Sequence, residues 1–264
     1  MASRTPPLAL WRGMAAGIVL ALLLGAWLAP AQAGDDDRKA FQAQVTEHSR
    51  RLADYKKQRD VHGLYDEIWR APTLYREAKD LSAYAALQAR LVHGIGPLCK
   101  HKDERIRRCA VEALGVMKND EGARYLKPLL KDVRKPPVDP VAMAAIESSG
   151  GVCHESLVEP LLKIVQECPC PRAAGKAVEA LGHFGKIKNK REKILIVVLE
   201  STLAEENLKR WKGLADAAPA SLNRLTGRKV ASLQDWLELV DNNRQDLSVL
   251  FEKEEVVKEE PAGA

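Results

Sequence analysis

The feature that most constrains the fold of this chain is an internal repeat with a period of 32 to 35 residues. The segment AVEALG occupies residues 110–115 and returns at 177–182, and AMAAIE at 142–147 is a weaker copy between them. A second marker has the same period, because LKPLLKDV at 126–133 and VEPLLKIV at 158–165 are 32 residues apart. Two independent markers with one period indicate stacked supersecondary units, typical of a helical solenoid.

Each copy is predicted to form two helices that bury their apolar stripes only by stacking on neighbouring copies. Asp103, Asp139-Pro140 and Pro171 are placed to begin the first helices of the three copies. Gly150-Gly151 is predicted to end the first helix of the second copy. Pro128 and Pro160 occupy matching positions in the second helices and are predicted to produce a shared bend.

Composition favours an all-α fold. Ala and Leu dominate the hydrophobic residues, which make up 46% of the chain, whereas aromatic residues make up only 5%. Ala, Leu, Glu, Lys and Arg are the strongest helix formers. The one β-like run, ILIVVL at 194–199, lies inside a longer helical pattern, so we interpret it as a buried helix segment.

The segment DERIRRCAVEALGVMKNDEGARYLKPLLKD resembles a HEAT repeat, of the short bacterial kind also found in bilin-lyase-like HEAT proteins. The matching elements are Arg107 or Arg108, the Ala-Leu-Gly at 113–115 and Asp132. The resemblance covers about residues 100–205. It implies a right-handed α-solenoid of four to five stacked antiparallel helix pairs, and it says almost nothing about activity, because this scaffold hosts many functions.

The first 33 residues have the layout of a secretory signal peptide. Arg4 and Arg12 precede the apolar run GMAAGIVLALLLGAWLA, and PAQA provides small residues before a cleavage site after Ala33. We therefore expect export, with the mature protein periplasmic or secreted. The alternative is a membrane anchor that is not cleaved, although the apolar run is shorter than a spanning helix requires.

The remaining chain divides by pattern into four parts. We predict an N-terminal helical cap over 34–80, beginning with a charged amphipathic helix at 36–60, and HEAT-like repeats over 81–205, with residues 72–101 adding two helices. A closing helix pair is predicted over 206–245, where Ser232 with Asp235 resembles a capping box. The acidic residues 246–264 are predicted to be disordered.

Five cysteines leave several chemistries open: Cys99, Cys109, Cys153, Cys168 and Cys170. Export permits disulfides, and we consider a Cys99–Cys109 bridge and a bridge from Cys153 to Cys168 or Cys170. The alternative is that some are small buried hydrophobic residues. Cys99, His101 and Cys109 could also ligate a metal, and Cys168 and Cys170 could add two ligands, but the paired spacing of a zinc site is missing.

Enzymatic activity is weakly supported, and we predict no catalytic residue, metal or cofactor. Deoxyhypusine hydroxylases, which are HEAT-repeat enzymes, hold two irons through several His-Glu pairs, whereas this chain matches only at His154-Glu155. No feature points to the pigment site of a bilin lyase. Without Arg4 and Arg12 the chain keeps 39 Lys and Arg against 36 Asp and Glu, a net charge of +3. That is too mild to indicate nucleic-acid binding.

The remaining hypothesis is a binding surface. Second helices of HEAT-type repeats usually line the concave face, and their polar positions here are Arg124, Lys127, Lys131, Glu159, Lys163 and Gln166. Together with the basic turns KDVRKPP, IKNKREK and LKRWKG, these could form a groove for an acidic protein segment or an anionic polymer. We expect an exported scaffold for protein–protein interaction in a bacterial envelope. The alternatives are a metal-binding or enzymatic protein using Cys and His, lyase-like or hydroxylase-like, and a membrane-anchored subunit of a larger complex.

Overall fold

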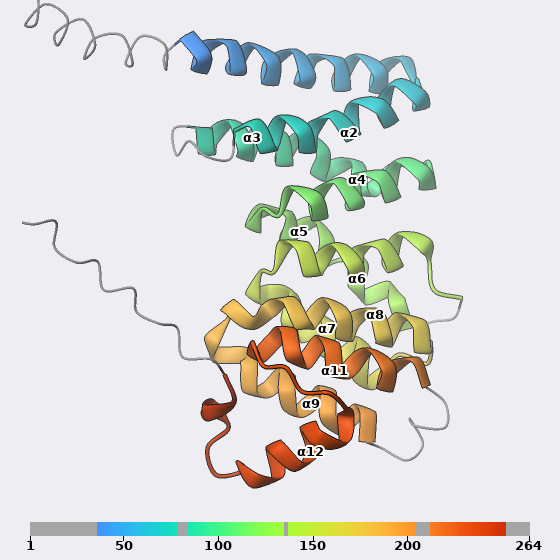
Figure 1. The fold of residues 1–264 in the computed structure, drawn as a ribbon. Coiled ribbons are helices and arrows are strands. Elements are labelled where there is room, and N and C mark those ends of the chain that lie inside the picture. The colour runs from blue at the N-terminus through green and yellow to red at the C-terminus, as the bar shows by residue number, and fades with distance from the viewer. Residues whose placement is uncertain (1–35, 79–83, 135–136, 204–211, 252–264) are drawn as a thin grey trace, which may run out of the picture.

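The computed structural model describes residues 36–78, 84–134, 137–203 and 212–251, and within these ranges the chain is all-helical, without a strand (Figure 1). The signal segment predicted over 1–33 lies outside the described residues. A first helix over 36–58 leads into ten further α-helices. Their bounds are α2 Val61–Glu77, α3 Ala85–Ile95, α4 Glu104–Met117, α5 Ala123–Leu126, α6 Pro140–Val152, α7 Val158–Glu167, α8 Pro171–Leu181, α9 Arg191–Leu203, α11 Lys212–Thr226 and α12 Leu233–Asn242.

The helix starts follow the predicted capping residues. The Asp103 carboxylate accepts a hydrogen bond from the Arg105 amide at 2.9 Å, and Asp139 accepts one from the Val141 amide at 2.9 Å. Pro140 and Pro171 are the first residues of α6 and α8. Ser232 and Asp235 form a reciprocal capping box at the start of α12. These signals are local, so the sequence is sufficient to place them.

The helices form two rows. In the first row, α2, α4, α6, α8 and α11 each contact the next. In the second row, α5 with the 3₁₀ turn Leu129–Arg134 is followed by α7 and then α9. Helix α11 packs on α8 and so continues the first row. Within the closing pair predicted over 206–245, α11 therefore extends the first row of helices.

Small residues hold the first row together. A Cβ atom on Gly151 would lie 2.3 Å from the Gly115 carbonyl oxygen, and one on Gly182 would lie 2.9 Å from the Cα of Ser221. The prediction that Gly150-Gly151 ends a helix is wrong, because α6 runs through both residues to Val152. Because glycine has no Cβ atom, these residues let the backbones of adjacent helices approach closely.

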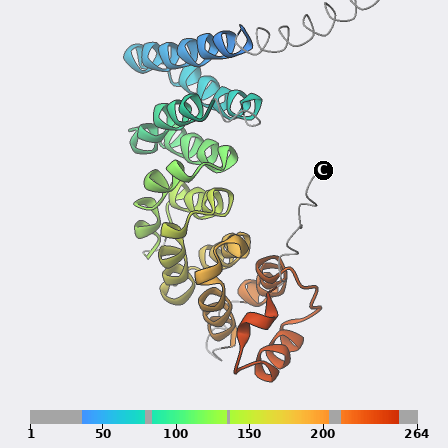
Figure 2. The same cartoon turned by 90° about the vertical axis from the view of Figure 1, so that its left-hand side faces the viewer.

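This close packing sets the direction of the curve. Figure 2 shows the stack bending, with α6, α8 and α11 toward the inside of the bend and α7 and α9 toward its outside. The second helices therefore do not line the concave side, contrary to expectation. The physical reason is that rows of Ala, Gly and Ser bring the first helices closer together than the bulkier second helices can come.

The two matched prolines act differently. Pro128 lies two residues after Leu126, the last residue of α5, and the chain continues as a 3₁₀ turn from Leu129. Pro160 lies in the first turn of α7, which continues to Glu167. The shared bend predicted from their alignment is therefore wrong, because Pro160 stands in the first turn of its helix, where a proline is tolerated, whereas Pro128 stands beyond the end of α5.

The first two helices are joined by a polar pair inside an apolar interface. His48 of the helix over 36–58 is 1% exposed, and its Nδ1 lies 2.8 Å from Oε1 of Glu67 in α2, which is 5% exposed. The charged amphipathic helix predicted over 36–60 is confirmed. The two helices expected within 72–101 are not, because α2 runs from Val61 through Pro72 and only α3 follows.

The last described residues, 246–251, are held by contacts with the helices. Leu250 and Phe251 are buried, and the Arg228 guanidinium donates to the carbonyl oxygens of Leu250 at 2.7 Å and Val249 at 2.5 Å. The disorder predicted for 246–264 is therefore wrong for residues 246–251, and residues 252–264 lie outside the described part. None of the helices described is long and apolar enough to cross a membrane.

Candidate functional site

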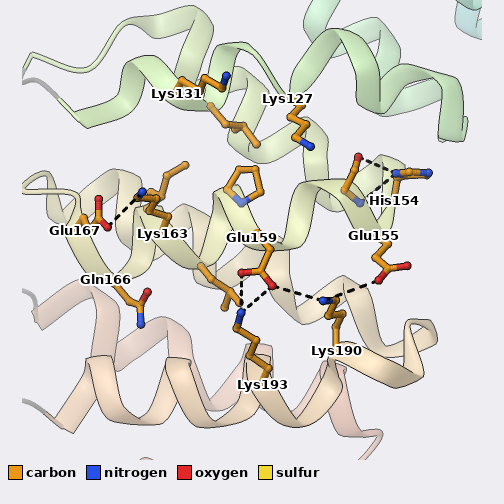
Figure 3. A pocket seen from close by; sticks show the side chains of 15 residues that line it. Lys127, Lys131, His154, Glu155, Glu159, Lys163, Gln166, Glu167, Lys190 and Lys193 are labelled. Carbon is orange, nitrogen blue, oxygen red and sulfur yellow. Dashed lines mark hydrogen bonds and ion pairs between the residues drawn. The ribbon is translucent and has the colours of Figure 1, made fainter.

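Five of the six predicted binding residues gather around one hollow on the second row (Figure 3). The hollow has a volume of about 850 Å³ and lies across Lys127 and the turn Leu129–Arg134, α7 and the start of α9. Its lining includes Lys127, Lys131, Glu159, Lys163 and Gln166. We call it the lysine groove.

Arg124 is not part of the lysine groove. Its guanidinium lies 2.7 Å from Nδ1 of His93, contacts the hydroxyl of Tyr125 and lies 3.6 Å from the Glu121 carboxylate. Its Cζ also sits 4.6 Å from the centre of the Tyr125 ring. The residue is thus engaged with its own neighbours, away from the other five.

Helical spacing explains why the groove is polar at its rim and apolar at its floor. Glu159, Lys163 and Gln166 are exposed on one side of α7 because residues three and four apart share a face. Leu161 and Val165 are buried on the opposite side, whereas Leu162 and Ile164 are buried at the floor of the groove. The groove is therefore a fixed surface on a packed helix, with only its long side chains free to adjust.

Two lysines from α9 and the turn before it complete the site. Lys193 donates to both oxygens of Glu159, at 2.8 and 2.7 Å, and Lys190 lies 3.5 Å from Glu159 and 4.0 Å from Glu155. These contacts connect one helix pair to the next. The hydrogen bond from Lys193 is the main cause that holds the pKa of Glu159 below its usual value. The sequence signal was present in the basic run IKNKREK, but its meeting with α7 required the packing of the next pair.

Charge in the groove is not balanced. Lys127, Lys131, Lys163, Lys190 and Lys193 face three carboxylates, Glu155, Glu159 and Glu167. Lys190 and Lys193 are neutralised by Glu155 and Glu159, and Lys163 lies 3.8 Å from Glu167. Lys127 and Lys131 make no ion pair or hydrogen bond with any described residue. Both side chains are exposed and are available to an external carboxylate.

The single His-Glu pair has a structural role. His154 caps the turn Glu155–Leu157, where its Nδ1 accepts a hydrogen bond from the Ser156 amide at 3.2 Å and lies 2.9 Å from the Ser156 hydroxyl. Glu155 instead accepts from the Asn189 amide nitrogen at 3.0 Å. Within the described ranges no three His, Cys, Asp or Glu residues are grouped closely enough to hold a metal ion.

The five cysteines are all free in the structure, so neither predicted disulfide forms. The reason is that the thiols face separate partners. Sγ of Cys109 donates to the Tyr65 carbonyl at 3.9 Å, that of Cys153 to the Gly150 carbonyl at 2.7 Å and that of Cys168 to the Val133 carbonyl at 3.4 Å.

Burial also keeps two of these thiols protonated. It raises the pKa of Cys99 and of Cys109 to about 12. A metal or a nucleophilic reaction requires the thiolate. These two positions therefore serve as packed apolar side chains.

Comparison with known proteins adds no identification at this point. No protein-family model matches the chain, and no curated protein shows significant similarity to it.

Proposed function

We propose that this chain is an exported α-solenoid of HEAT-like helix pairs that binds an acidic segment of a partner protein in a bacterial envelope. The binding site in this proposal is the lysine groove. Support for the solenoid comes from the sequence repeat, the resemblance of residues 100–205 to HEAT repeats and the succession of contacts along two rows of helices.

The observation that carries the binding proposal is the pair Lys127 and Lys131. Both are exposed and have no ion pair with any residue that the structure describes, whereas the neighbouring Lys190 and Lys193 are paired. An exposed ion pair contributes little on its own. Several lysines along one groove can instead steer an acidic segment to it and fix its register.

An extended acidic peptide fits this groove better than a compact ligand. The lining comes from three successive second-row elements, so the lysines form a strip that crosses the helices. The carboxylates of a segment lying along the strip could replace those of Glu159 and Glu155 as partners of the lysines. Its apolar groups would rest on Leu130, Leu162 and Ile164.

The test is a pull-down from the envelope fraction with three purified baits. The first is the wild type, the second carries Lys127→Glu and Lys131→Glu, and the third carries Lys118→Glu and Lys229→Glu as a control with the same change of charge at exposed positions outside the groove. We expect one partner at near-stoichiometric yield with the wild type and the control, lost with the groove variant and lost in high salt.

Equal capture by all three baits would contradict the proposal. Intact-mass measurement of the wild-type bait tests the two remaining expectations. Export predicts a chain that begins after Ala33. Bound metal or a bound small molecule would instead favour the metal-binding or enzymatic alternative.

A further inference from the structure

We infer that the chain has a second, separate ligand site, a cationic pocket that binds a phosphate ester or another multiply charged phosphate group. The pocket has a volume of about 400 Å³ and lies between the turn that joins the helix over 36–58 to α2 and the segment that leads from α3 into α4. Its lining shares no residue with the lysine groove. The inference is therefore independent of the proposed function.

The first argument is the charge of the lining. Of its nine residues, none is a carboxylate and five are basic: Lys56, Arg59, Lys100, His101 and Lys102. The three lysines and the arginine are exposed, and their side chains make no ion pair or hydrogen bond with any residue that the structure describes. The lysine groove, by contrast, sets three carboxylates against its five lysines. The charge of the cationic pocket is therefore left for an external anion to compensate.

The two carboxylates nearest in sequence are used elsewhere. Oδ1 of Asp60 accepts a hydrogen bond from the Gly63 amide at 3.0 Å, at the start of α2. Asp103 accepts one from the Arg105 amide at 2.9 Å and lies 3.5 Å from the guanidinium of the same residue. Both carboxylates cap helices, and neither lines the pocket.

One wall of the pocket is held in place by hydrogen bonds to its backbone. The Arg107 guanidinium donates to the carbonyl oxygens of His101 at 2.9 Å and Lys102 at 3.0 Å. Nδ1 of His101 accepts a hydrogen bond from the Asp103 amide at 3.1 Å. In the neutral ring the hydrogen is therefore on Nε2, which is left as a donor for a ligand.

The opposite wall is a tight turn. The Asp60 amide donates to the Tyr55 carbonyl at 3.0 Å, and Arg59 within this turn has a φ of 59°. Such a closed turn fixes the backbone from which Lys56 and Arg59 extend. Both walls are thus set by the fold, and only the long basic side chains need to adjust to a ligand.

The number of charges favours phosphate over carboxylate. A carboxylate carries one negative charge, whereas a phosphate monoester carries about 1.5 to 2 and offers three strong acceptor oxygens. Guanidinium and ammonium groups are the usual partners of such oxygens. The pocket also has an apolar floor, because Leu64 and Leu98 line it and are buried. A phosphate ester would place its carbon part there, whether it is a small soluble molecule or a lipid headgroup.

Isothermal titration calorimetry with inorganic pyrophosphate at low salt tests the site on the purified chain. The pocket variant carries Lys56→Gln, Lys100→Gln and Lys102→Gln. The control variant removes the same charge at exposed positions outside both sites, with Lys57→Gln, Lys118→Gln and Lys229→Gln. We expect one pyrophosphate per chain for wild type and control, and at least about tenfold weaker binding by the pocket variant, from the loss of three ion pairs. Equal affinity for all three proteins would overturn the inference.

Arg59→Gly separates binding from folding. Glycine adopts the positive φ of this position without steric cost, so the thermal midpoint of unfolding should not fall. Binding of pyrophosphate should nevertheless weaken, because the guanidinium is lost. Unchanged affinity in this folded variant would overturn the assignment of the site to this pocket.

Two further arms identify the chemistry and its source. Acetate at matched ionic strength should compete with pyrophosphate far less than inorganic phosphate does, and equal competition would overturn the choice of phosphate. Sedimentation with phosphatidic acid vesicles, against vesicles of phosphatidylcholine alone, distinguishes the sources. Vesicle binding that the pocket variant loses supports the inference with a lipid headgroup as the ligand. Pyrophosphate binding without vesicle binding supports it with a small soluble ligand.

The proposed function and this inference can fail separately. The groove variant with Lys127→Glu and Lys131→Glu should bind pyrophosphate as the wild type does. Loss of pyrophosphate binding in the groove variant, with normal binding by the pocket variant, would move the phosphate site to the lysine groove and overturn the inference. Capture of the envelope partner by the pocket variant should remain normal.

Discussion

The two rows of helices are packed in different ways. In the first row, Gly115, Ser148 and Gly151 allow the backbones of adjacent helices to approach closely. In the second row, leucines and valines fill the core and the helices stand farther apart, leaving the lysine groove between them. The close packing that sets the curvature and the candidate binding surface therefore lie in different rows.

Charge follows the same division. Several exposed ions of the first row are paired, as in Arg108 with Glu112 at 2.7 Å and Lys176 with Glu147 and Glu179 at 3.7 and 2.8 Å. In the second row, Lys127 and Lys131 have no partner in the described chain.

The largest effect should come from removing bulk in the second row. Leu161→Ala deletes a fully buried side chain in α7. We expect it to lower the free energy of unfolding by about 3 kcal/mol, because a cavity remains under the groove. Urea denaturation followed by circular dichroism measures it, with Lys163→Ala on the same helix as an exposed control. A loss below about 1 kcal/mol would mean that the second row is not a packed core.

The next effect comes from adding bulk to the first row. Gly151→Ala places a methyl group 2.3 Å from the Gly115 carbonyl oxygen, and overpacking of this kind costs about 1–3 kcal/mol. Gly94→Ala is the matched control in α3, where the new methyl group would lie 3.6 Å from Leu52. It should stabilise the protein by about 0.5–1 kcal/mol, because alanine is the better helix former. If both changes have the same sign, close approach does not hold the row together.

A smaller effect concerns the interface between the helix over 36–58 and α2. Burial, which outweighs the hydrogen bond to Glu67, lowers the pKa of His48, so the folded state favours the neutral ring. Stability from this group is therefore fully present above pH 6.5, the ordinary value, and is lost as the pH falls through the lower pKa of the folded state.

His48→Gln should remove that part of the pH dependence. Denaturation between pH 7.5 and 5 measures the slope for both proteins. Arg70 and Arg51 also approach Glu67, so the comparison must keep them unchanged. Identical slopes for wild type and variant would assign the pH dependence to other groups.

The smallest effect on stability belongs to the groove lysines. Changing Lys127 and Lys131 to Ala should alter the free energy of unfolding by no more than about 0.5 kcal/mol, because neither residue has a partner in the described chain. The same change should weaken binding of an acidic probe peptide by at least about tenfold. A large loss of stability would show that these residues serve the fold, and the contrast between the rows would fail.

The sequence was sufficient wherever the cause is local. The caps at Asp103, Asp139-Pro140 and Ser232 depend on a few neighbouring residues, and the helix through ILIVVL follows from its periodic flanks. It failed where the cause lies in another element. Gly150-Gly151 looks like a helix stop until α4 and α8 are placed against it.

The candidate site divides in the same way. Lys127, Lys131, Glu159 and Lys163 could be selected because helical spacing exposes them on their own helices. Lys190 and Lys193 could not be assigned to the same site, because only the stacking of α9 on α7 brings them to Glu159. The fastening of residues 246–251 was likewise hidden, since it depends on Arg228 and Arg191 from other helices.

The contact of each first-row helix with its neighbours along the chain has a mechanical consequence. Tension applied between the two ends would pass through the helix interfaces in series, so that the weakest one yields first while the others stay intact. The interface holding His48 and Glu67 is the one with a polar pair at its centre. If that interface yields first, the stack would lengthen from its N-terminal end.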